Sequence, residues 1–401
     1  MKILNKTFVI LLLVIFSFPL ISQEDSVETK PKFMVSGYAD AYYNLSFQKP
    51  GAGAKLWGPA AGSRAFDINN NQFSLGMVQG KFTYTTSKVD IVADLIAGPN
   101  ATLATVANFK SAAWPNGLGG GTLGIKQLYG AWKATDKLTL TIGAFGTHIG
   151  YELIEPTLNF NYSLSNLFNN GPFFHTGLKA NYAISDKVGL MVGLVNNWDN
   201  FDENNGFKSP IFQLSLLPVD GLSIYLNAIL GKGDVAGTLN PEFGKLDEPN
   251  SFNTRLLDLV AIYTVGKVTF GVNAASGAYT GSNSDAKNIF KGITKNEKTS
   301  PTWGGIAGYF NVAATDNFSI GTRIEQFNDY YGVRYIGAKN TSLTFTGSIT
   351  CADGSLILKP EFRFDSSKGK NNVNGHVDIY NDKNGTTDVQ QTLGMSAIFK
   401  F

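Results

Sequence analysis

Runs of alternating apolar and polar residues recur along nearly the whole chain. An alternation with a period of two is typical of β-strands that have one apolar and one polar face. Clear examples are 138–144, 318–325 and 356–365. Sixteen strands are expected near 33–47, 72–86, 88–98, 123–134, 138–150, 173–185, 187–198, 210–218, 222–233, 254–264, 267–279, 302–314, 317–328, 341–350, 355–365 and 390–401.

The connections between these strands alternate in length. Seven are tight turns, marked by pairs such as Asp136-Lys137 and Asp220-Gly221. Eight are long and polar, near 48–71, 99–122, 151–172, 199–209, 234–253, 280–301, 329–340 and 366–389. Sixteen strands with both chain ends on one side need seven turns on that side and eight loops opposite, as bacterial outer-membrane barrels have. The pattern predicts an all-β fold, a transmembrane antiparallel up-and-down β-barrel of about 16 strands.

The N-terminus has the form of a secretory signal peptide. Lys2 and Lys6 precede an apolar run at 8–21, which is shorter than the ~20 residues of a spanning helix. Cleavage after Ser22 would leave two parts: a signal peptide at 1–22 and an outer-membrane β-barrel at 23–401. Beyond the signal no run is long and apolar enough for a membrane helix, so a membrane-spanning chain must cross with strands that close on themselves.

A soluble β-propeller is the main rival fold, because its blades also repeat every 40–50 residues or so. Each repeat here holds two strands and one long loop, whereas a blade packs four short strands. One face of the strands is also free of charge, as contact with lipid requires.

The last strand ends at Phe401, the kind of terminal strand that the barrel-assembly machinery recognises. Lipid of the outer membrane and that machinery are therefore the expected partners.

Several short motifs resemble the OmpL-like β-barrel porin family. They are 36–44 in the first strand, Arg64 with 66–67, 71–75, 161–163 and 172–177. The resemblance extends over essentially the whole mature chain. It implies an outer-membrane barrel of porin type, and it offers no catalytic or binding residues to carry over.

Charge and cysteine content exclude other classes. Removal of Lys2 and Lys6 from the 33 basic residues leaves 31, equal to the 31 acidic residues. A neutral chain lacks the basic surplus of a nucleic-acid binder, so no nucleic acid is expected as a partner. Cys351 is the only cysteine, which rules out an intramolecular disulfide, and we expect it in a turn.

The polar faces of the strands are expected to line an aqueous lumen, since sixteen strands enclose a channel. The predicted pore-lining residues are Asp40, Asp90, Asp94, Arg323, Glu325, Lys359, Glu361, Arg363 and Asp365. The long loop 151–172 is predicted to form a constriction, with Glu152 and Glu155 as its charged residues. Its many apolar side chains favour a position inside the barrel mouth. Pro360 interrupts one strand, where we expect a local bulge.

A porin for passive diffusion of small polar solutes or ions is the favoured function. The alternative is a barrel whose long outer loops bind a partner or surface, with little flux. A third reading is a barrel enzyme that uses His148 and His175, although no nucleophile pairing accompanies them. No cofactor and no metal are expected. The solute, the charge preference and the oligomeric state, monomer or homo-oligomer, remain open.

Overall fold

A computed structural model gives the fold of the chain. The structure describes residues 30–51, 53–56, 64–105, 123–203, 206–232, 252–281, 302–330, 334, 336–369 and 379–401. The expected signal peptide at 1–22 lies outside the described residues. Among the described residues, no helix has the length and apolar character to cross a membrane.

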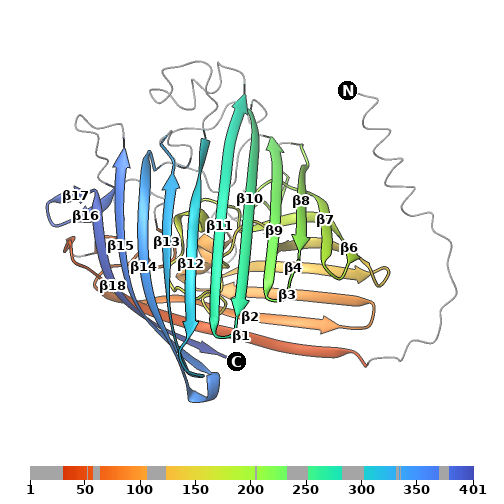
Figure 1. Ribbon diagram of the computed structural model, residues 1–401, viewed down its shortest axis with the longest axis horizontal. Helices are drawn as coiled ribbons and strands as arrows, with labels where there is room; N and C mark the ends of the chain where they lie inside the picture. Colours follow the sequence, from red (N-terminus) through yellow and green to blue (C-terminus); the bar gives the residue numbers. More distant parts are fainter. Residues whose placement is uncertain are drawn as a thin grey trace.

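Sixteen antiparallel strands form a closed barrel, as the sequence predicts. Neighbours in sequence are neighbours in the sheet, and β1 pairs with β18 to close the ring. Figure 1 shows β1–β3 running nearly horizontally across the lower part of the view, while β9–β15 stand more upright. The barrel strands are β1 (Lys32–Ser46), β2 (Gln72–Thr85), β3 (Val89–Ala97), β4 (Leu123–Lys133), β5 (Leu138–Gly146), β6 (Phe174–Ser185), β7 (Val188–Val195), β8 (Ser209–Leu216), β9 (Leu222–Lys232), β10 (Phe252–Val265), β11 (Val268–Gly281), β12 (Thr302–Ala313), β13 (Phe318–Asn328), β14 (Ala338–Cys351), β15 (Leu356–Gly369) and β18 (Val389–Lys400).

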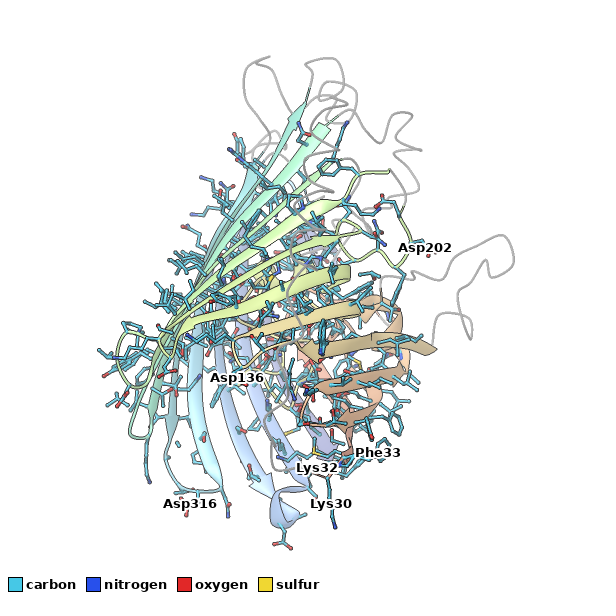
Figure 2. The ribbon with its side chains drawn as sticks, turned by 90° about the vertical axis from the view of Figure 1, so that its right-hand side faces the viewer. Lys30, Lys32, Phe33, Asp136, Asp202 and Asp316 are labelled. Atoms are coloured by element: carbon cyan, nitrogen blue, oxygen red, sulfur yellow. The ribbon has the colours of Figure 1, made fainter. Side chains whose placement is uncertain are left out.

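The two ends of the barrel differ in their connections. In Figure 2, Asp316 in a tight turn lies at the same end as Lys30 and Lys32, while Asp202 in a long connection lies toward the other end. The C-terminus is also at the turn end (Figure 1). We call the end with the tight turns and the chain ends the turn end, and the opposite end the loop end. Bacterial barrels place their short turns in the periplasm.

The two faces of each strand meet different surroundings. On the outer face Phe73 is 91% exposed and Ile324 is 60% exposed. The neighbouring Arg323, whose side chain lies on the inward face, is fully buried. Exposed apolar side chains on this scale would be unstable in water and are what a lipid-facing band requires. The outer face is therefore apolar, whereas the inward face carries both polar and apolar side chains, many of them buried.

Three local expectations need correction. Pro360 causes no bulge, because β15 keeps one register with both neighbours and Pro360 faces Met395. The facing residue on β14 is Gly347, whose added Cβ would lie 3.2 Å from Pro360 Cγ, so glycine leaves room for the ring. Cys351 is the last residue of β14 rather than a turn residue. The final long loop holds a two-stranded hairpin, β16 (Tyr380–Asp382) and β17 (Gly385–Thr387), that the sequence pattern did not predict.

Candidate functional site

The connection between β5 and β6, residues 147–173, folds into the barrel; we call it the inserted loop. Its side chains and backbone reach inward residues on opposite sides of the ring. Tyr162 donates its hydroxyl to Asp40 Oδ2 on β1 at 2.6 Å, and Gly150 N–H donates to Asp258 Oδ2 on β10 at 3.0 Å. The loop therefore spans the lumen, within slightly wider bounds than the predicted 151–172.

Two glutamates of the wall hold the loop by its backbone N–H groups. Glu325 on β13 accepts from Asn166 N at 2.8 Å and Leu167 N at 2.7 Å, the first residues of the short helix α3 (Asn166–Asn169). Glu361 on β15 accepts from the backbone of Tyr162 at 2.9 Å. The first N–H groups of a helix lack a partner within the helix, and those of an irregular segment also need acceptors. Here buried carboxylates accept strong, charge-assisted hydrogen bonds from them.

Three basic residues of the same wall hold the loop by its carbonyl groups and one carboxylate. Arg323 on β13 donates to Ser163 O at 2.7 Å and to Glu152 Oε1 at 2.5 Å. Arg363 on β15 donates to Leu164 O at 2.8 Å. Lys359 on the same strand donates to Pro156 O at 2.7 Å and also to Asn159 O. The charges of this wall therefore alternate in sign and match the donors and acceptors of one irregular segment.

The other side of the loop is fixed by an ion pair. Glu155 binds Lys126 on β4, and Gln79 on β2 donates to the same carboxylate at 3.3 Å. Burial alone would raise the pKa of Glu155, but the neighbouring Lys126 ammonium outweighs it and holds the pKa below its ordinary value. Glu155 is therefore a stable carboxylate at neutral pH.

Small inward residues make room for aromatic rings of the loop. A Cβ on Gly271 of β11 would lie 2.7 Å from the Tyr151 ring, and one on Gly321 of β13 would lie 2.6 Å from the Phe160 ring. Tyr151 also stacks on Tyr309 of β12, with ring centroids 4.1 Å apart. The wall and the loop thus have complementary shapes as well as charges.

The predicted site residues fall into two groups. Eight of the nine inward residues are buried, with relative exposures between 0% and 7%. The ninth, Asp90 on β3, is partly exposed and pairs with Lys133 at 3.0 Å. Glu152 and Glu155 both bind wall cations from the loop. The structure brings loop and wall residues together, while the role of these residues in permeation stays a prediction.

Sequence reasoning missed three charged residues of this network. Arg64 and Asp67, from the first long loop, pair at 2.6 Å, and Arg64 lies 3.7 Å from Asp365. Phe66 packs beside Phe168 of the inserted loop, with centroids 6.2 Å apart. Lys126 was missed although it is an inward residue of a predicted strand. The available signal for the first pair was two opposite charges three residues apart, at 64 and 67, in a stretch that carries one of the family motifs.

His148 and His175 lie side by side at the loop end, with ring centroids 5.7 Å apart. His148 Nε2 lies 3.1 Å from Ala228 O, and His175 lies 3.0 Å from Thr147 Oγ1 and 3.2 Å from Asn197 O. Burial lowers the pKa of His148 to about 4, so its imidazole is neutral at pH 7. Over the described ranges, no group of three or more metal-ligating side chains is found.

Comparison with known proteins gives one family and several similar structures. The family described as "Putative beta-barrel porin-2, OmpL-like" matches residues 32–401. Trimeric OmpT of Vibrio cholerae is 10% identical, with a TM-score of 0.57 over 92% of this chain and 99% of that one. An anion-selective porin from Comamonas acidovorans is 10% identical, with a TM-score of 0.55 over 93% of this chain and 100% of that one. The channel DcaP of Acinetobacter baumannii is 9% identical, with a TM-score of 0.53 over 94% and 100%. No curated protein matches the sequence.

Proposed function

Because the chain belongs to the OmpL-like beta-barrel porin-2 family, we propose that it is a passive diffusion channel for small polar solutes or ions whose passage is narrowed by the inserted loop. Its place is the cell outer membrane, where the family's barrels and the similar structures belong. A channel of this kind needs a polar lumen and a fixed narrow point.

The observation that supports the proposal is the anchoring of one segment to both sides of the lumen. Glu325 and Arg323 hold it at one wall, and Lys126 holds it at the other through Glu155. All three wall residues are buried and paired. Removal of one partner of a buried ion pair costs about 3–5 kcal/mol, so the loop is a rigid part of the interior rather than a loose surface segment.

Flux measurements on the purified full-length protein test this function. Proteoliposomes should swell in neutral sugars at rates that fall steeply with sugar size, and planar bilayers should show discrete conductance steps. Empty vesicles are the control. A protein that inserts into vesicles, shown by protease protection, yet gives neither swelling nor conductance would contradict the proposal and favour the reading in which outer loops bind a partner.

Three narrower statements belong to the same proposal. We infer that the chain is not an enzyme, since the nitrogens of His175 and Nε2 of His148 already face hydrogen-bonding partners. The strand ending at Phe401 is proposed as the segment that the barrel-assembly machinery recognises, because it is alternating and closes the barrel against β1. A homo-oligomer is proposed by likeness to OmpT, whose structure is described as a trimer.

A further inference from the structure

The inward charges are distributed unevenly around the barrel. On β13–β15 they alternate in sign and bind the inserted loop, as described above. On β7–β12 the inward positions are apolar, glycine or neutral polar, apart from Asp258 on β10. Asp258 is buried and accepts from Asn227 at 2.8 Å, Asn273 at 2.6 Å and the loop backbone. Neither stretch offers free charge to a passing ion.

The strands β2–β6 are different, because their inward lysines other than Lys126 reach solvent. Lys81 on β2 and Lys179 on β6 lie on the inward face. Their cross-strand partners, the buried Asp94 for Lys81 and Gly193 for Lys179, are inward residues. Both lysines are half-buried. Within the described part of the chain neither lysine forms an ion pair, and Lys179 lies 4.3 Å from the centroid of the Phe145 ring.

The nearby carboxylates are already engaged. Asp94 accepts from Gln79 at 2.8 Å and from Gln127 at 3.0 Å, and lies 3.4 Å from Lys126. Asp90 pairs with Lys133, and the side chains of that pair are 27% and 37% exposed. The solvent-reaching inward charges of β2–β6 are therefore three lysines against one aspartate. We call Lys81, Lys133 and Lys179 the lysine patch.

Lys81 and Lys133 lie toward the turn end of the barrel, whereas the amino group of Lys179 lies over the ring of Phe145, next to the start of the inserted loop. Lys133 is the last residue of β4, directly before the turn at Asp136, and it donates to Thr86 O in the neighbouring turn at 3.4 Å. Lys32 on β1 and Lys400 on β18 continue the inward face at the rim of the same end. A solute that has passed the loop therefore enters a half of the lumen with a positive surplus.

We propose that the lysine patch attracts small anions and makes the channel anion-selective. This inference rests on the proposed function, because it assigns the solute class of that channel. Like-signed charges lining a narrow, low-dielectric passage concentrate counterions and raise their flux over that of co-ions. The effect should weaken with salt, since the screening length falls from about 10 Å at 0.1 M to about 3 Å at 1 M.

The zero-current potential across a planar bilayer in a KCl gradient tests the proposal. The wild-type protein should pass chloride in preference to potassium. The triple variant Lys81→Gln, Lys133→Gln, Lys179→Gln should lower the chloride-to-potassium permeability ratio by at least about two-fold at 0.1 M salt, and less at 1 M. The matched control is Lys137→Gln, which removes a lysine from a turn at the same end without touching an inward face; its ratio should change little.

The outcomes separate this inference from the function beneath it. A wild-type channel that prefers potassium, or a triple variant with an unchanged ratio, would overturn the anion proposal while leaving the channel intact. Absence of conductance in the wild type would instead contradict the proposed function. Should the triple variant fail to fold, shown by loss of its heat-modifiable gel shift, Lys179→Gln and Lys179→Arg replace it. The arginine variant should keep the wild-type ratio and the glutamine variant should lower it.

Discussion

The wall formed by β13–β15 and the wall formed by β2–β6 both present charged residues to the lumen, but they use them differently. The first wall holds the inserted loop with several charged residues, whereas the second holds it through Lys126 and leaves three lysines in contact with solvent. Arg323 and Glu325 are fully buried against the inserted loop. Lys81 and Lys179 are half-buried and have no carboxylate partner in the described structure. An inward charge therefore has a structural role where a loop reaches it and is available to solutes where none does.

The largest difference between the walls is expected when one cation is removed from each. Arg323→Met leaves Glu152 and the Ser163 carbonyl without their partner, at a cost of about 3–5 kcal/mol. We expect the loop to loosen, so that larger sugars swell proteoliposomes faster and the conductance becomes noisy. Lys179→Met, the matched change on the other wall, should alter ion preference and leave the sugar size limit unchanged. Equal effects of both variants on sugar size would contradict the comparison.

A smaller effect on stability and on sugar flux is expected when Glu325, the carboxylate that binds the start of α3, is replaced. Glu325→Gln keeps the shape but replaces charge-assisted hydrogen bonds from Asn166 and Leu167 with weaker ones, a loss of about 1.5–3 kcal/mol. The midpoint of thermal unfolding in detergent should fall, and disaccharide swelling should rise modestly. Glu203→Gln, in an exposed outer loop, is the control and should behave as wild type. An unchanged midpoint would show that the loop does not depend on this wall.

Shape complementarity can be tested at a glycine of the same wall. A Cβ on Gly321 would lie 2.1 Å from Asn311 Oδ1 and 2.6 Å from the Phe160 ring. Gly321→Ala should displace that ring at a cost of about 1–3 kcal/mol, seen as a lower unfolding midpoint and altered conductance. Gly130→Ala, on an outer face with open space around it, should cost much less. The reverse order of the two midpoints would contradict the described fit of the loop.

The smallest effect on conductance is expected when the pH is lowered and Glu155, the loop residue that binds Lys126 on β4, becomes protonated. Lys126 holds the pKa of Glu155 below its ordinary value of 4.5. A depressed carboxylate stabilises the fold above its unfolded pKa, and that stability is lost as the pH falls through the lower folded pKa. The conductance of Glu155→Gln should therefore differ from that of the wild type at pH values above 4.5, and the difference should disappear only as the pH falls below 4.5. Loss of this difference well above pH 4.5 would contradict the assignment.

The strands were predictable from sequence because each responds to a local pattern. Lipid on one side and water on the other impose the period of two, and the alternation of turns and loops fixes the strand number. The apolar content of the loop with Leu164 and Phe168 also indicated burial. The partners were not predictable, since nothing in the order of residues shows that Arg363 meets the carbonyl of Leu164, nearly two hundred positions away. The β16–β17 hairpin was missed because its strands are three residues long.

The most direct measurement is a disulfide between the inserted loop and the wall that holds it. Asn161 donates to Thr346 Oγ1 on β14 at 2.7 Å. In a Cys351→Ser background, which removes the one native cysteine, we predict that the pair Asn161→Cys and Thr346→Cys forms a disulfide in intact outer membranes under mild oxidation. The control pair Asn161→Cys and Thr139→Cys, with its second cysteine on β5, should not. Failure of the first pair to cross-link in correctly folded protein, or equal cross-linking of both, would contradict a loop fixed across the lumen.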